Sequence, residues 1–475
     1  MAPLLAFFPK VVGTVIAKDN AMGNQLLELE RTIARANNRR IAIALFGLYL
    51  LLLLTPLTTA WATQPRTNLP FLAELGKSFA LIGFAILALQ FVLSSRHPVI
   101  SQPFGLDLVL RYHKAMGTLA GCLLLLHPFL IAAGTGKWRL IYGVVLPWPV
   151  WLGKIALVLL AVQVVTGLGQ RQLLAFEKWR TLHNEAVVIF GLVLVHSLNV
   201  GDDLKHLPLQ VLWGLLALLA AAAYVYHKVY RPAGSRQFAY HIKDVIPESY
   251  NVRTLVLEPP AGAAPYFYLP GQFHFLKLYR GDRRYDGEEH HFTISSSPTQ
   301  QGLLASTIKE SGDFTASLGT AKPGDVVHLE GPYGRFSFLL HEQRDLLVFL
   351  AGGIGITPIM SMLRFLRDTG SERRAVLLNA NKTEKDIIFR QELEEMVKGG
   401  HPRLRVVQVL TRPPRTWKGE YGHIDQGMIR RFCGLDIHGM QFYVCGPPGM
   451  MDMLDRELRE LGVDPEQVHS ERFWL

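Results

Sequence analysis

The stretch RYHKAMGTLAGCLLLLHPFLIAAG, residues 111–134, is apolar, long enough to cross a lipid bilayer, and holds two histidines, His113 and His127. Ionisable side chains are costly inside a membrane, and those that occur there usually have a function. The stretch therefore predicts a membrane-spanning helix whose two imidazoles have a chemical role.

Six apolar segments, this one included, lie in the first half of the 475-residue chain. Each is close to the roughly 20 residues that span a bilayer. We expect spans at about residues 41–60, 76–94, 110–133, 149–168, 184–201 and 209–227. The fold class expected is thus a membrane α-helical bundle of six transmembrane helices (41–230), after an N-terminal cytoplasmic or interfacial segment (1–40) and before a cytosolic module.

Basic residues are concentrated in the loops that would lie on one side of the membrane. The N-terminal flank and the second and fourth loops hold three or four lysines and arginines each, the tail after the sixth span holds two, and the other loops hold one or two. The positive-inside rule then places both termini in the cytoplasm, in a multi-pass protein of the cell (inner) membrane. The same distribution explains the formal charge of +10, and without a basic stripe interleaved with aromatic residues no nucleic-acid partner is expected.

Three cysteines without a CxxC pair argue against a disulfide framework or a cysteine-held metal cluster.

Two more histidines, His183 and His196, bracket the fifth span. The third and fifth spans run in the same direction, so His113 and His183 share the inner level, and His127 and His196 share the outer level. Fourteen residues of helix rise about 21 Å, which separates the levels by most of the apolar thickness. Since one haem iron takes two axial imidazoles, the pattern favours two stacked bis-histidine haems. The alternative is a set of histidines that hydrogen-bond between helices or lie at the interface.

The spacing in the fifth span is irregular for a straight helix. Fourteen residues return to nearly the same helix face, but thirteen miss it by roughly 140°. We therefore expect a local bulge or tilt between His183 and His196.

The character of the sequence changes after about residue 236. Residues 236–342 hold short β-rich runs between proline and glycine turns, which predicts a small antiparallel β-barrel. Residues 343–475 alternate apolar strands with helical patterns, as in an α/β Rossmann-like domain with a parallel, nucleotide-binding sheet.

HHFTISSSP, residues 290–298, has a basic residue, an aromatic ring and hydroxyls at alternating positions of a β-rich stretch. Strand alternation puts His290, Phe292 and Ile294 on one side and Thr293 and Ser295 on the other. This combination suits a flavin, which needs a positive group for its pyrophosphate, a ring to pack on and a hydroxyl near its reactive nitrogen. The alternative is an ordinary hydroxyl-rich strand.

Three further glycine-containing turns could contribute to ligand binding. KESGDFTASL (309–318) offers a glycine turn with hydroxyls at the start of a helix. AGGIGITPIMSML (351–363) and YVCGPPGMMDML (443–454) each follow a strand and enter a helix, although neither is a GxGxxG motif. The second places Cys445 at the carboxyl end of its strand, where open parallel sheets bind ligands; the alternative is an inert packing cysteine. LTRPPR (410–415) places Arg412 and Arg415 after another strand, where an arginine could bind a 2′-phosphate with two hydrogen bonds, unless the stretch is a solvated loop.

Together these motifs resemble the NADPH oxidase and ferric reductase superfamily, in which a six-helix di-haem membrane domain is fused to a ferredoxin–NADP reductase-like module. The resemblance covers about residues 40–475. It rests first on the histidine spacings of 14 in the third span and 13 in the fifth. It rests also on HHFTISSSP, GPYG, AGGIGITP, CGPPGM and the terminal SERFWL.

The resemblance implies cofactors and site residues. Two haem b groups would be ligated by His113, His127, His183 and His196. FAD would be held by His290, Phe292, Thr293 and Ser295, with Gly312 and Thr315 near its phosphates. The nicotinamide nucleotide would bind at Gly352, Gly353, Gly355, Thr357 and Pro358, with Cys445, Gly446 and Pro447 near the nicotinamide and Arg412 favouring NADPH over NADH. The aromatic that covers the flavin until nicotinamide displaces it would be Phe473, with Trp474 as the alternative.

The sequence departs from the family pattern at two positions. His291 stands where the family usually has a proline. Ile131 stands where animal oxidases carry a further histidine near their oxygen site, which bears on whether their oxygen chemistry carries over. With no EF-hand loop before the membrane domain and with short outer loops, we expect a constitutive bacterial member.

The expected function is transmembrane electron transfer within a lipid bilayer. Cytosolic NADPH would reduce FAD, and electrons would pass through the inner and then the outer haem to an acceptor on the outer side. O2, giving superoxide, ranks first, and ferric or cupric chelates rank second. The alternatives are a membrane subunit that donates electrons to a partner protein and a flavin reductase whose spans are only an anchor. The sequence specifies neither the physiological acceptor nor the oligomeric state.

Overall fold

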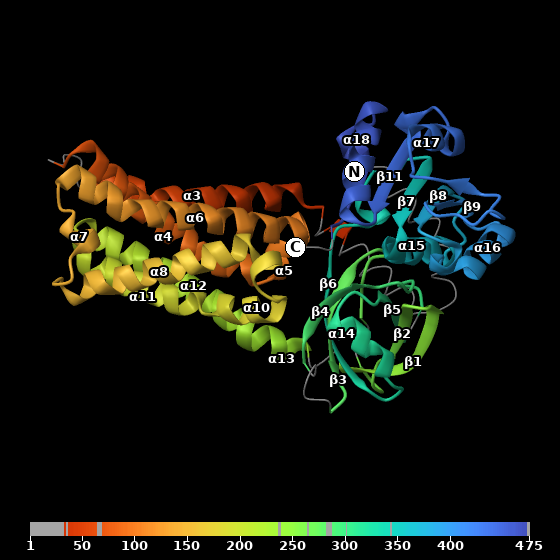
Figure 1. The fold of residues 1–475 in the computed structure, drawn as a ribbon, viewed down its shortest axis with the longest axis horizontal. Coiled ribbons are helices and arrows are strands. Elements are labelled where there is room, and N and C mark those ends of the chain that lie inside the picture. The colour runs from red at the N-terminus through yellow and green to blue at the C-terminus, as the bar shows by residue number, and fades with distance from the viewer. Residues whose placement is uncertain are drawn as a thin grey trace. The chain divides into compact units, whose positions relative to one another are not determined.

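The computed structural model describes residues 33–34, 37–63, 69–235, 239–263, 266–281, 287–300, 302–342 and 344–472. The chain separates into two compact units, one formed by Arg39–Arg231 and the other by Pro232–Leu475 together with the chain up to Asn38. Figure 1 shows the first unit as a bundle of helices and the second as two sheet-containing domains. The interfacial segment expected at residues 1–40 falls almost entirely outside the described residues.

Six helical segments among the described residues are long and apolar enough to cross a membrane, which confirms the six-span prediction. They are Arg39–Thr63 (α3), Phe71–Ser94 (α4), Leu106–Thr135 (α6), Trp148–Leu168 (α8), Phe176–Val200 (α10, Phe176–Asn184, and α11, Ala186–Val200) and Leu207–Gly234 (α12, Leu207–Val225, and most of α13, Arg231–Ser235). The short helices α5 (Pro98–Phe104), α7 (Arg139–Tyr142) and α9 (Gln170–Leu173) lie between them.

Helix α4 forms the centre of the bundle. Its Phe84 stacks on Trp213 of α12 with ring centroids 4.5 Å apart and lies 5.5 Å from Phe190 of α11. Trp213 is 1% exposed, and its Nε1 donates to Ser197 Oγ at 3.1 Å. In α3, by contrast, Pro56 is the one buried residue of the described helix. The aromatic cluster therefore packs α4, α11 and α12 together. In α3, Leu53, Leu57 and Ala60 pack against this core, whereas exposed side chains such as Ile43 and Leu51 are left to face lipid.

The fifth span is interrupted. Helix α10 ends at Asn184 and α11 begins at Ala186, with Glu185 between them at φ −69° and ψ −4°. The interruption lies between His183 and His196, in the span where the thirteen-residue spacing predicts a bulge or tilt. It frees the two histidines from the register of one straight helix.

The first domain of the second unit is an antiparallel sheet, as predicted. Its strands are β1 (Ala239–Ser249), β2 (Val252–Glu258), β3 (Phe273–Tyr279), β4 (Glu289–Thr293), β5 (Leu304–Lys309) and β6 (Val326–Tyr333). They pair in the order β4-β3-β6-β1-β2-β5. Alternate residues of β3 and β6, such as Leu276, Leu278 and Val327, are fully buried in one core. The short helix α14 (Asp313–Ser317) adds Phe314 to that core.

The second domain is α/β with a parallel sheet, which confirms the Rossmann-like prediction. Its strands are β7 (Leu346–Gly352), β8 (Arg374–Asn381), β9 (Arg403–Leu410), β10 (Glu420–Tyr421), β11 (Met440–Cys445) and β12 (Val468–Ser470). Its helices are α15 (Ile356–Asp368), α16 (Arg390–Gly399), α17 (Gln426–Cys433) and α18 (Pro448–Glu460). The strand order β10-β9-β8-β7-β11-β12 reverses direction beside β7, and open parallel sheets bind ligands at the carboxyl ends of the strands at such a point.

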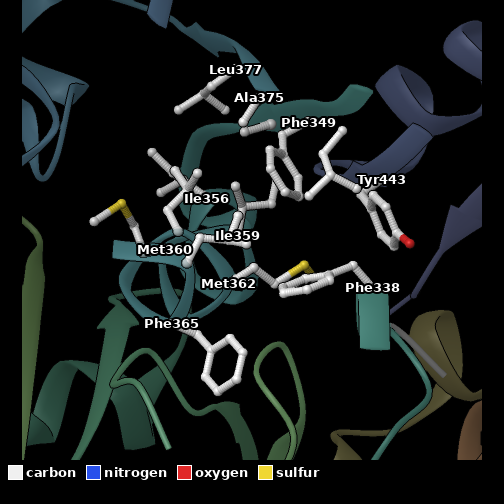
Figure 2. Packing of buried hydrophobic residues seen from close by; sticks show 14 of the residues in the cluster. Phe338, Phe349, Ile356, Ile359, Met360, Met362, Phe365, Ala375, Leu377 and Tyr443 are labelled. Atoms are coloured by element: carbon white, nitrogen blue, oxygen red, sulfur yellow. The ribbon is translucent and has the colours of Figure 1, made fainter. Parts of the chain in front are cut away.

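Strand β7 separates two hydrophobic cores. Leu347 and Phe349 face one core, where Figure 2 shows Phe349 beside Ile359 of α15. Val348 and Leu350 face the other core. Because both faces of β7 are covered, its sequence is continuously apolar, as is typical of a central parallel strand.

Candidate functional site

The four membrane histidines come together in two pairs. His113 of α6 and His183 of α10 have ring centroids 6.0 Å apart and ring planes at 87°. Two bonds of about 2 Å to one metal ion would place the two ligating nitrogens about 4 Å apart. Ring centroids 6.0 Å apart leave room for that nitrogen separation, and so for one metal ion between the rings. His127 of α6 and His196 of α11 form the second pair and are close enough to interact electrostatically.

His127 has its tautomer fixed by its own helix. Its Nδ1 lies 2.6 Å from the carbonyl oxygen of Leu124, and because a carbonyl can only accept, Nδ1 is the donor. In a regular helix that carbonyl would accept the N–H four residues later, but residue 128 is a proline and has none. Pro128 thus frees the acceptor, and Nε2 is left unprotonated, which is the form that binds a metal.

His196 is held by the neighbouring helix. Its Nδ1 lies 2.8 Å from the carbonyl oxygen of Pro149, in the first turn of α8. The helices can approach because residue 153 is a glycine: a Cβ there would lie 2.6 Å from Cε1 of His196. This ring too presents Nε2.

The pair of His113 and His183 is held in part by a side-chain amide. His183 Nδ1 lies 3.0 Å from Gln163 Oε1, and Gln163 Nε2 donates to the carbonyl of Leu182 at 2.7 Å. The second bond fixes the orientation of the amide, so that Oε1 accepts and Nδ1 donates. His113 lies beside α4 at Gln90, and its buried Nδ1 has no hydrogen bond of ordinary geometry to a described residue.

Three of the four rings therefore present an unprotonated Nε2, and all four occur in two pairs. Paired neutral imidazoles with hydrogen-bonded Nδ1 atoms are the donor set of bis-histidine haem ligation. The residues of the bundle thus fit two haem groups, one at each pair.

The stretch expected to hold flavin forms β4 and the loop after it. His290 stacks on Phe314 with ring centroids 3.9 Å apart, and Phe292 lies on the same side. His291 faces the opposite side, toward Phe273 of β3. The strand therefore alternates as the sequence predicts, and His290 and Phe292 are half-buried.

The hydroxyls near this strand divide into two kinds. Ser295 is fully buried and its Oγ lies 2.9 Å from Thr307 Oγ1. Leu304 and Ile308 of the same strand as Thr307 face the core of the domain, so Thr307 and this hydroxyl lie on the other face of the sheet. Thr315 Oγ1 accepts from Ser311 N at 2.7 Å and donates to the carbonyl of Gly312 at 3.0 Å, so it shapes the turn. A Cβ at Gly312 would meet nothing within 4 Å, which leaves room beside this turn for a phosphate.

A second group of residues gathers at the end of β4. Thr293 pairs with Phe273 in the sheet, and a Cβ at Gly334 would touch both Phe273 and the carboxylate of Glu471. Glu471 is 3% exposed. Burial raises the pKa of the Cys445 thiol far above its usual value, and the charge of Glu471 raises it further. Cys445 is therefore a neutral thiol near a buried carboxylate, suited to packing rather than to nucleophilic attack.

A cavity of about 420 Å³ lies at the carboxyl ends of the parallel strands beside β7. Its size is within the range of small-molecule sites. Of the predicted residues, Gly352, Gly353 and Pro447 line it. Lys382 lines it from the second domain and Lys309 from the β-barrel. The cavity thus occupies the position where a nucleotide binds in such sheets.

The other predicted residues of the two glycine turns do not line the cavity but lie in the turns that form it. A Cβ at Gly355 would collide with the carbonyl of Cys445, and one at Gly446 would lie 3.1 Å from Gly352 Cα. Thr357 Oγ1 donates to the carbonyl of Ile354 at 3.0 Å, and Pro358 is buried within α15. These residues let the two turns pack closely.

Arg412 lies next to the cavity rather than in its wall. It follows the lining residue Thr411, and its backbone N–H donates to the carbonyl of Lys382 at 2.8 Å. This bond joins the loops after β8 and β9. Phe473 and Trp474 lie outside the described residues.

Four residues of these sites were missed by the sequence reasoning: Gln163, Asn381, Lys382 and Glu471. Gln163 could have been found, because a polar residue within an apolar span is itself a signal. Asn381 and Lys382 directly follow β8, as cavity residues of such sheets do. The Asn381 side chain is 5% exposed, and its Nδ2 has no hydrogen-bond partner among the described residues.

Three family models match the chain. They are "Ferric reductase like transmembrane component" over residues 79–194, "Oxidoreductase FAD-binding domain" over 240–338 and "Oxidoreductase NAD-binding domain" over 349–456. The first lies within the helical bundle, the second on the antiparallel domain and the third on the parallel one.

Individual relatives resemble part of the chain. NADH-cytochrome b5 reductase 2 of Mus musculus is 32% identical over 189 residues, which cover 34% of this chain and 68% of that protein. The glycine betaine monooxygenase reductase subunit of Pseudomonas aeruginosa is 31% identical over 235 residues, 48% of this chain and 62% of that protein. The chain spans less than two thirds of the length of the first curated relatives. The solved flavohemoglobin of Malassezia yamatoensis is 18% identical, with a TM-score of 0.48 over 77% of this chain and 97% of that one.

The three matched models occur in one chain, in the order membrane component, FAD-binding domain and NAD-binding domain. The chain therefore belongs to the NADPH oxidase and ferric reductase superfamily.

Proposed function

We propose that this protein carries electrons across a membrane, from cytosolic NADPH to an acceptor on the outer side, with O2 as the first candidate and superoxide as its product. The observation that supports this most is that one chain combines a nucleotide cavity, a flavin-type strand and two histidine pairs in a six-helix bundle. When bound, FAD supplies hydride acceptance, and haem supplies one-electron transfer.

On the nucleotide side, the residues of the chain bind and orient. Gly352, Gly353 and Pro447 would hold the nicotinamide nucleotide in the cavity, and Arg412 would select its 2′-phosphate. Cys445 would pack near the nicotinamide as a neutral thiol, because burial raises its pKa. The flavin would be held by His290, Phe292 and Thr293, with Gly312 and Thr315 at its phosphates.

In the bundle, His113 and His183 would hold the inner haem and His127 and His196 the outer one. The excess of lysine and arginine in the second and fourth loops supports cytoplasmic termini, and with them an inner haem on the cytoplasmic side of the membrane.

The acceptor is the least constrained part of the proposal. A Cβ at Gly76 would lie 2.9 Å from Cγ1 of Ile131, so Ile131, one helical turn beyond His127, packs on α4, and its side chain offers no proton donor. One-electron reduction of O2 to superoxide needs none. Reduction of a ferric chelate is the second candidate, which the match to the ferric reductase-like model supports.

The test uses the purified full-length protein in detergent. We expect FAD and about two low-spin haems per chain by absorption spectroscopy. NADPH oxidation in oxygen should reduce cytochrome c at a rate that superoxide dismutase suppresses. If dismutase has no effect but a ferric chelate restores turnover, ferric reduction replaces the oxidase assignment. If neither acceptor supports turnover while the haems still become reduced, the electrons go to a partner protein; without haem, the proposal fails.

A further inference from the structure

We propose that Arg364 is a positioning residue for hydride transfer, which fixes the nucleotide turn relative to the flavin strand. The inference rests on the proposed function, since it takes the nucleotide to bind at the start of α15 and the flavin to bind along β4.

Arg364 joins the two domains of the second unit. Its Nη1 donates to the carbonyl of Ser295, in the loop directly after β4, at 2.6 Å. Its Nε and Nη2 donate to the two carboxylate oxygens of Glu392 at 2.9 and 2.6 Å. The guanidinium also lies 5.0 Å from the ring centroid of Phe389, and the side chain is 12% exposed. The guanidinium group of Arg364 is thus held on three sides, and the ammonium group of a lysine could not reproduce this geometry.

Two more bonds run from the same face of α15 to the same loop. Ser361 Oγ donates to the carbonyl of Ser296 at 2.6 Å, and Thr299 Oγ1 donates to Asp368 Oδ2 at 2.6 Å. Residues 361, 364 and 368 are spaced to lie on one side of a helix. Helix α15 is therefore attached to the flavin-side loop from Ser361 to its last residue, with Arg364 between the other two contacts.

The loop is equally fixed on its barrel side. Ser296 Oγ lies 2.8 Å from Tyr268 OH and accepts from Ala305 N at 3.0 Å. Ser295 N donates to the carbonyl of Ala305 at 2.7 Å. The loop therefore cannot follow a displaced helix without disturbing the barrel.

These contacts connect the two reacting sites by a short route. Gly352 and Gly353, at the cavity, lead directly into α15, and Thr293 of β4 lies two residues before Ser295. The bonds of Arg364 and Ser361 therefore set the separation between the bound nicotinamide and the flavin. A displacement of about 1 Å at such a junction can slow a reaction roughly a hundredfold while binding persists.

Arg367 provides a matched control. It lies on the same helix, and its Nη1 donates to Glu392 Oε1 at 3.1 Å, so it shares the ion pair. Its hydrogen bonds with described residues go to Glu392 and Asp368, within the nucleotide domain. Arg367→Gln removes a charge from the same cluster but none of the groups that bond the flavin-side loop directly, because Asp368 keeps its carboxylate for Thr299.

The experiment compares full-length wild type, Arg364→Gln, Arg367→Gln and Ser361→Ala in stopped flow, following flavin absorbance at saturating NADPH. We expect flavin reduction to slow about 10- to 100-fold in Arg364→Gln and several-fold in Ser361→Ala, with less than a threefold change in Arg367→Gln. Affinity for NADP+ should change less than threefold in all. The primary isotope effect from NADPH deuterated at the transferred hydrogen should rise in Arg364→Gln and Ser361→Ala alone.

The inference is overturned if Arg364→Gln matches Arg367→Gln in rate and isotope effect. If Arg364→Gln loses its flavin, Ser361→Ala decides, and a wild-type rate there overturns the inference. A wild type whose flavin NADPH does not reduce contradicts the proposed function instead.

Discussion

The Nδ1 atom of His127 lies 2.6 Å from the carbonyl oxygen of Leu124, an oxygen that Pro128 leaves without its usual helical partner. His127 and His196 are thus oriented by backbone carbonyls, whereas His183 is oriented by the side chain of Gln163. A hydrogen bond from Nδ1 raises the basicity of an imidazole ligand and so affects the metal that it binds. The two histidine pairs should respond to different substitutions.

Pro128→Ala restores an N–H that competes with His127 for the Leu124 carbonyl. With a weaker hydrogen bond from Nδ1, His127 should be a less basic metal ligand. The midpoint potential of one haem should then become more positive, while that of the other stays unchanged. Redox titration of haem absorbance measures this. Pro56→Ala, in the interior of α3, is the control for removing a helix proline. Equal shifts of both haems, or none, would contradict the assignment.

Gln163 substitutions should act on the other haem. Gln163→Leu removes the acceptor of His183 and should shift one midpoint upward, whereas Gln163→Glu supplies a charged acceptor and should shift the same midpoint downward. The haem that moves must be the one unaffected by Pro128→Ala. Shifts of the same sign in both variants would mean that the hydrogen bond is not the cause.

The histidine pairing could be predicted because helix geometry relates sequence spacing to depth. The thirteen-residue spacing also predicted an irregular fifth span, and the chain is interrupted at Glu185. The local effect of Pro128 was missed even though it depends only on the i to i−4 rule of helices. To predict this effect, one has to ask which acceptor each ring nitrogen of His127 uses.

The contacts between domains could not be predicted in the same way. Arg364 and Ser295 lie 69 residues apart, and no periodicity relates a helix of one domain to a loop of another. The cavity likewise combines Lys309 of the barrel with Lys382 of the parallel sheet. Motifs place each cofactor on its own domain, but the relation between domains depends on packing that the sequence does not encode locally.

Arg412→Ser tests the choice of nucleotide. Loss of a charged hydrogen bond to the 2′-phosphate, worth about 1.5–3 kcal/mol, should raise KM for NADPH roughly 10- to 100-fold and leave KM for NADH unchanged. Arg415→Ser removes the other arginine of the same loop, and it should behave as wild type if Arg412 alone recognises the 2′-phosphate. Parallel increases for both nucleotides in Arg412→Ser would exclude a role in 2′-phosphate recognition.

Acid should destabilise the second unit through two stacked histidines. His341 and His469 have ring centroids 3.5 Å apart, and burial together with the Arg335 charge lowers the pKa of His341 to about 4. Burial, then His341 and Arg335, lower the pKa of His469 to about 3. In the unfolded chain both titrate near about 6.5, so between about pH 6.5 and 4 the unfolded state binds more protons and stability falls as pH falls.

For each pH unit that the pH falls in that window, each of these histidines should therefore lower the free energy of unfolding by up to about 1.4 kcal/mol. His341→Phe keeps an aromatic ring against His469 but removes one titrating group and one source of repulsion. The temperature at which half of the flavin is released from the full-length protein should then fall less between about pH 7 and pH 5 than it does in wild type. His438→Gln, at an exposed histidine of the same domain, should keep the wild-type slope. If His341→Phe keeps that slope as well, the acid sensitivity has another origin.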